Sequence, residues 1–130
     1  MRTLVLDVVP GEYAIARLPV GERVPRTLLD GTSDGLVSVT RTAVELSVVC
    51  PVGLLPDEAD SEAGWRVLSV RGPMPFTLTG IIAALSSELA AAGVALFSLS
   101  TFDTDHVLVR DADLRRAVTA LRAAGHEVVE

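Results

Sequence analysis

Apolar side chains recur with a helical spacing in the second half of the chain. Leu78, Ile81, Ile82, Leu85 and Leu89 share one face of a predicted amphipathic helix, and Gly93 stands where a left-handed terminating residue is expected. A second helix is expected after Asp111, which can cap it, and to end before Gly125. Its inner face would consist of Leu114, Ala117, Val118 and Leu121.

Runs rich in branched apolar residues separate these helices and predict strands. The expected strands are Trp65–Arg71, Val94–Ser100, His106–Arg110 and His126–Val129. With the two helices they form the order β-α-β-β-α-β, which is typical of a ferredoxin-like α+β sandwich with two helices on one face of a four-stranded antiparallel sheet.

The first half is predicted to be mostly β. Strands are expected at Thr3–Val9, ended by Pro10-Gly11, and at Glu12–Leu18, followed by one helical turn at Arg26–Leu29. Two further strands, Leu36–Thr40 and Glu45–Cys50, predict a hairpin. The polar stretch Pro51–Ala63, whose carboxylates are expected to be solvated, indicates a boundary, so we expect units at residues 1–62 and 63–130.

The two halves carry similar segments sixty positions apart. Residues 38–49 and 98–109 both follow the order strand, polar connection, acidic residue, strand. Two short hairpins can also resemble each other by chance. On the repeat interpretation, the first half is a reduced copy of the second, with Thr3–Val9 completing its sheet. A unit of that size buries too little surface to be stable alone, so it is expected to pack against the other unit or a second chain.

Composition and charge exclude several classes of protein. The chain has 130 residues, 49% of them apolar, a net charge of −6 and a pI near 4.8. This apolar content argues against disorder, and the acidity argues against nucleic-acid binding. No apolar run is long enough to span a membrane, and the first residues do not resemble a signal peptide, so a cytoplasmic protein is expected.

The reactive side chains are few. All eleven basic residues are arginine, so lysine chemistry is absent, and the single Cys50 cannot form an internal disulfide or a multi-thiolate metal site. No nucleophile–base spacing or phosphate-binding loop is recognisable. We therefore expect no enzyme activity, no metal and no cofactor.

The second half resembles the ACT-domain family. The resemblance is carried by Gly72-Pro73 after the first strand, by residues 78–82 at the helix start and by residues 100–109 in the hairpin. Together with residues 38–49, these motifs are similar to the tandem ACT type of bacterial proteins related to the CASTOR arginine sensors. The resemblance implies a non-catalytic regulatory module that binds an amino acid or a similar metabolite at the junction between ACT units.

The resemblance also implies a ligand site. Its members would be the hairpin pair Thr101 and Phe102, Asp105 for the ligand's ammonium group, Gly80 with Ile81 at the helix start, and the backbone of Ser38 and Val39. Ala83 stands where arginine sensors have an acidic residue, which argues against arginine as the ligand.

The same residues also have structural explanations. Gly80 would allow the helix to pack closely on the sheet, Asp103 and Asp105 are common in turns, and His106 would lie on the sheet or against a helix. The competing function is a structural or oligomerisation protein without a small-molecule ligand. A homodimer is the default for ACT units, although an internal duplication is equally compatible with a monomer.

Overall fold

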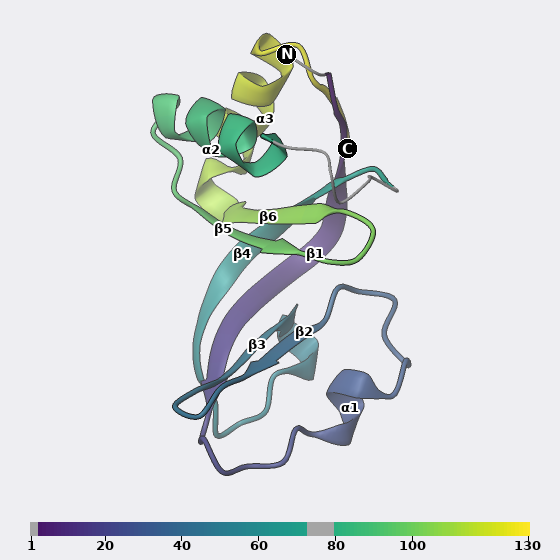
Figure 1. The fold of residues 1–130 in the computed structure, drawn as a ribbon, viewed down its shortest axis with the longest axis vertical. Helices are drawn as coiled ribbons and strands as arrows, with labels where there is room; N and C mark the ends of the chain where they lie inside the picture. The colour runs from purple at the N-terminus through teal and green to yellow at the C-terminus, as the bar shows by residue number, and fades with distance from the viewer. Residues whose placement is uncertain (1–2, 73–79) are drawn as a thin grey trace. The chain divides into compact units, whose positions relative to one another are not determined.

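The computed structural model describes residues 3–72 and 80–130. The chain divides into two units, each described here by itself: an N-terminal unit of residues 11–65 and a C-terminal unit of residues 1–10 and 66–130. Two long strands, β1 (Val5–Leu18) and β4 (Asp60–Val70), contribute residues to both units (Figure 1).

The C-terminal unit has the predicted order of elements. After β4 come α2 (Ile81–Ala91), β5 (Leu96–Ser100), β6 (Asp105–Arg110), the 3-10 turn Asp111–Asp113, α3 (Leu114–Ala123) and β7 (Glu127–Val129). Both helices lie on one side of the sheet (Figure 1). The predicted α+β, ferredoxin-like fold class is confirmed. Gly93 and Gly125 end the helices with φ of 76° and 99°, but Asp111 begins the 3-10 turn instead of capping α3.

The N-terminal strand lies in a different place from the one predicted. The expectation that Thr3–Val9 completes the sheet of the first half is wrong, because Val5–Asp7 pairs in parallel with β7. β1 also pairs with β4, so the strand order in this unit is β7-β1-β4-β6-β5 and the sheet exceeds the four strands expected. Residues 1–10 therefore belong with the C-terminal unit.

Pro10-Gly11 does not end the strand. β1 pairs with β7 over Val5–Asp7 and with β3 (Leu46–Pro51) over Tyr13–Leu18, so the pair falls between these two ladders. The missing proline N–H therefore costs no bond to β7 or to β3, and Gly11, with φ of 94°, takes up a backbone angle that other residues avoid. The two predicted strands are therefore one.

One hydrophobic core holds the C-terminal unit together. Leu4 and Leu6 from the start of the chain pack with Leu85 and Leu89 of α2, all of them buried. β5 contributes only the partly buried Leu96. Further buried members come from β4, α2, β6, α3 and β7 and from the connection after α2: Leu68, Val70, Ile81, Val94, Val107, Val109, Ala117, Val118, Leu121 and Val128. Leu78 of the predicted helix stripe lies outside the described residues. The predicted inner faces of both helices thus pack into this core, which fixes the orientation of α2.

The N-terminal unit contains α1 (Arg26–Leu29) and the hairpin of β2 (Ser38–Arg41) and β3, as predicted. A 3-10 turn, Val52–Leu54, and the start of β4 replace much of the loop expected at Pro51–Ala63. A small core of Leu18, Leu28, Leu46, Val48 and Cys50 lies on one face of its strands.

The two hairpins of the chain share a local geometry. The N–H of Thr42 donates to Glu45 O and the N–H of Thr101 donates to Thr104 O, both over 2.8 Å. Cross-strand pairs close the connections, Arg41 with Leu46 and Ser100 with Asp105. Equivalent positions therefore differ by 59, one less than the offset inferred from the sequence. The relation of the two halves by duplication stays a prediction.

Candidate functional site

Five of the seven predicted ligand residues lie in the C-terminal unit. Gly80 and Ile81 are at the start of α2, while Thr101, Phe102 and Asp105 lie in and beside the β5–β6 connection. Ser38 and Val39 begin β2 in the N-terminal unit.

Gly80 occupies the N-cap of α2 in a left-handed conformation. Its φ is 82°, and a Cβ built on it would meet none of the described residues within 4 Å. Among the described residues no neighbour requires a glycine here for close packing, whereas the left-handed backbone angle does call for one. Its carbonyl accepts the first helical bond, from Ala84 N–H over 2.9 Å.

The first turn of α2 presents backbone donors. The N–H groups of Ile81, Ile82 and Ala83 precede the first helical bond and so have no acceptor within the helix. No described side chain caps them. The Ile81 side chain is buried in the core, so this residue can offer a ligand only its backbone. Ala83 is exposed.

The β5–β6 connection is a closed turn. Besides its backbone bond to Thr104, Thr101 accepts a hydrogen bond with its side chain: Oγ1 accepts from the Thr104 N–H over 3.3 Å. Phe102, by contrast, is 78% exposed. Thr104 Oγ1 donates to Val70 O at the end of β4. This bond fixes the turn beside the strand that leads into α2.

Asp105 begins β6 and lies after the turn, not within it. Its Oδ1 accepts a hydrogen bond from Ser100 Oγ across the hairpin. Its Oδ2 has no hydrogen-bond partner among the described residues. The residue is partly buried, so this carboxylate combines a fixed position with one available oxygen.

His106 lies on the sheet, as one of the structural explanations predicted. Its Nδ1 is 2.7 Å from Ser69 Oγ on β4. Burial lowers the pKa of His106, and the neighbouring Asp105 carboxylate opposes this effect in part. Within residues 3–72 and 80–130, no three His, Cys, Asp or Glu side chains gather closely enough to hold a metal ion, and no helix has the length and apolar character needed to cross a membrane.

The N-terminal unit carries a polar cavity that the sequence did not indicate. The cavity measures about 350 Å³, and its lining includes Arg17, Glu45, Asp60 and Glu62. Arg17 and Asp60 form an ion pair of 3.0 Å, with side chains 66% and 79% exposed. Carboxylates assigned to a solvated loop thus lie on β4. The alternation of Asp60 and Glu62 is the signal that could have placed them on a strand.

Comparisons with known proteins agree on the C-terminal unit. Residues 60–123 match the ACT-domain family, and residues 11–58 match a family described as an N-terminal domain. The human cytosolic arginine sensor for mTORC1 subunit 1 is 31% identical over 90 residues, which cover 68% of this chain and 27% of that protein. The chain therefore spans about a quarter of the length of the curated relatives it matches.

Two solved structures extend the likeness to nearly the whole chain. A protein from Agrobacterium tumefaciens shares 37% identity with a TM-score of 0.87, covering 99% of this chain and 94% of that one. The regulatory subunit of aspartate kinase from Thermus thermophilus shares 10% identity with a TM-score of 0.62, covering 92% and 96%, and shows a similar fold.

Proposed function

The chain belongs to the ACT-domain family, and on this premise we propose that it is a regulatory module of the cytoplasm that binds a free amino acid or a similar metabolite. The observation that carries the proposal is the start of α2, where a left-handed Gly80 precedes three backbone N–H groups that no described side chain caps. The cytoplasmic location and the regulatory role follow the relative named as a cytosolic arginine sensor.

The carboxylate of the ligand would bind at the start of α2. The N–H groups of Ile81, Ile82 and Ala83 offer hydrogen bonds, and the helix dipole favours a negative charge at this end. That field contributes roughly 0.3–1 kcal/mol, and up to about 2 kcal/mol in a partly buried site. The left-handed Gly80 carries no Cβ, so it places no side chain of its own beside these donors.

The ammonium group would bind Asp105. Ser100 holds one carboxylate oxygen, and Oδ2 is the oxygen that we assign to the ligand. Hydrogen bonds between charged partners contribute about 1.5–3 kcal/mol each. For a ligand of about ten heavy atoms, these contributions support an affinity between roughly micromolar and millimolar.

The side chain of the ligand is proposed to be less basic than that of arginine. The family resemblance places an acidic residue at position 83 in arginine sensors, and this chain has an exposed Ala83 instead. A guanidinium group would lack its counter-ion there. We therefore place small or uncharged amino acids ahead of arginine as candidate ligands.

Thermal-shift measurements with each of the twenty amino acids test the proposal. A ligand at about 100 times its Kd stabilises the native state by about 2.7 kcal/mol, which raises the Tm of a chain of this size by roughly 10 °C. Calorimetric titration of each ligand that raises the Tm then measures its Kd. Backbone amide shifts of Ser38 and Val39 on ligand addition test their predicted contribution separately.

Matched variants localise the binding. Asp105→Asn is expected to abolish the shift, because a neutral amide loses the charge that attracts the ammonium group. Asp103→Asn removes an exposed carboxylate from the same connection and should leave the shift intact. If no amino acid or close metabolite stabilises the wild-type protein, the proposal is wrong and a structural or oligomerisation role takes its place.

A further inference from the structure

A buried histidine joins three elements of the C-terminal unit. His126 lies between α3 and β7 and is 4% exposed. Its Nδ1 is 3.1 Å from the backbone nitrogen of Leu4, just before β1, and its Nε2 is 2.9 and 3.1 Å from the carboxylate oxygens of Glu88 on α2. The backbone N–H of His126 donates to the backbone oxygen of Leu121, in the last turn of α3.

These partners determine where the imidazole carries its proton. The Leu4 N–H can only donate, so Nδ1 must offer a lone pair. The single proton of the neutral ring is therefore on Nε2, from which it is donated to the Glu88 carboxylate. In this tautomer, each ring nitrogen has a complementary partner.

A second proton on the ring can bind only at Nδ1. It would occupy Nδ1 and point at the Leu4 N–H, so that two donors would face each other at the present 3.1 Å. The Glu88 carboxylate would hold the resulting imidazolium on the side of α2. Leu4 is only 6% exposed, so its N–H would lose its acceptor where water does not readily replace it.

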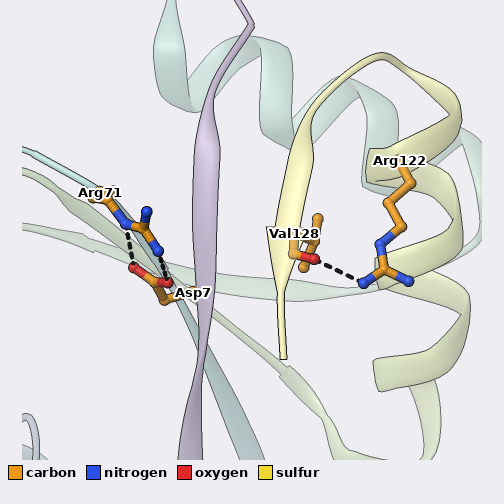
Figure 2. A network of polar contacts seen from close by, with 4 residues as sticks. All are labelled: Asp7, Arg71, Arg122 and Val128. Carbon is orange, nitrogen blue, oxygen red and sulfur yellow. Dashed lines mark hydrogen bonds and ion pairs between the residues drawn. The ribbon is translucent and has the colours of Figure 1, made fainter.

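The other charged side chains of α3 and the nearby Asp7 of β1 have partners of their own, among them Arg115 with Glu130 and Arg116 with Asp113. Arg122 of α3 donates to Val128 O over 2.7 Å and lies 3.4 Å from a Glu130 oxygen, and Asp7 of β1 is paired with Arg71 (Figure 2). Glu127 of β7 is exposed. Among the described residues, Glu88 is thus the charged side chain bonded to the imidazole.

We propose that His126 is a pH-sensitive latch on the N-terminal strand. In its neutral form the ring holds the Leu4 backbone next to β7, where Leu4 O also accepts from Glu127 N–H over 2.9 Å. In its protonated form the ring stays with Glu88 and releases the Leu4 N–H. Acidification therefore loosens the backbone at Leu4 while α2 and the rest of the core remain folded. This inference does not depend on the proposed ligand.

Nuclear magnetic resonance of the full chain tests the latch. The imidazole nitrogen shifts of His126 and the hydrogen exchange of the Leu4 amide are followed from about pH 8 to about pH 5. The Nε2–H tautomer is expected at the higher pH. As the ring takes up its second proton, the protection of Leu4, corrected for intrinsic exchange, should fall roughly tenfold or more. Protection of the Leu85 amide in α2 serves as the internal control.

Two variants sharpen the test. In His126→Asn, the amide oxygen can accept from Leu4 without titrating, so Leu4 protection should become independent of pH. Glu88→Gln keeps His126 but removes the carboxylate that stabilises the imidazolium. The loss of Leu4 amide protection should therefore occur at a lower pH than in the wild type. The proposal is overturned by an Nδ1–H tautomer at the higher pH, by protonation that leaves Leu4 protection unchanged, or by a ring that stays neutral until the protein unfolds.

Discussion

Replacing Gly80 by alanine isolates the contribution of one backbone angle. Gly80 caps α2 with φ of 82°, and a Cβ at this position meets no described residue within 4 Å. Steric overlap with the described residues therefore contributes nothing to the change. The left-handed conformation costs an alanine roughly 1–2 kcal/mol. Alanine also restricts the unfolded chain, which returns about 0.4–1 kcal/mol. The expected net loss of unfolding free energy is about 1 kcal/mol.

Urea unfolding followed by circular dichroism measures this loss, because α2 and α3 supply the helical signal of the C-terminal unit. The midpoint should fall at an unchanged m-value, since the surface exposed on unfolding stays the same. Gly80→Asn should lose less, because asparagine tolerates the left-handed region better than alanine does.

Gly53→Ala is the matched control for Gly80→Ala. Gly53 also has open space around its Cα, but it lies in the 3-10 turn Val52–Leu54 without a positive φ. Alanine there should leave stability unchanged or raise it by up to about 1 kcal/mol. A Gly80→Ala protein as stable as the wild type would refute the explanation by backbone angle, and with it the geometry assigned to the proposed carboxylate site.

Two further substitutions test the core and the half-buried histidine. Leu85→Ala should lower the unfolding free energy by about 2–5 kcal/mol, because Leu85 is 0% exposed and its removal leaves a cavity in the core. Ala83→Ser on the exposed face of the same helix should change it by no more than about 0.5 kcal/mol, and equal losses in both variants would contradict the packing. Burial lowers the pKa of His106 in the folded protein. Below about pH 6.5 the unfolded chain therefore binds more protons than the folded chain. The free energy of unfolding decreases as the pH falls from there toward the lower pKa of the folded state. Chemical denaturation across this range should show a smaller decrease for His106→Gln, whereas parallel curves would exclude the effect.

Part of the candidate site could be predicted because it depends on local patterns. The apolar stripe of α2 places Gly80 at the helix start. The pattern also predicts the β5–β6 hairpin, but it puts Asp105 in the connection and begins the strand at His106, one residue after the observed start of β6. The sequence did not predict which atoms of these residues are free to bind a ligand. The burial of the Ile81 side chain and the bond from Ser100 to Asp105 depend on neighbours that a periodicity does not identify.

The sequence alone therefore determined the two helices and the β5–β6 hairpin of the C-terminal unit, since each arises from contacts between residues close along the chain. The partner of the N-terminal strand was decided only by the tertiary structure. Alternating apolar residues show which face of a strand is buried, but they do not show which strand lies beside it. Val5 pairs with Glu127, and Leu4 donates to His126, across almost the entire chain. Such distant pairings depend on the whole core forming together, which is why β1 and His126 could not be assigned from the sequence.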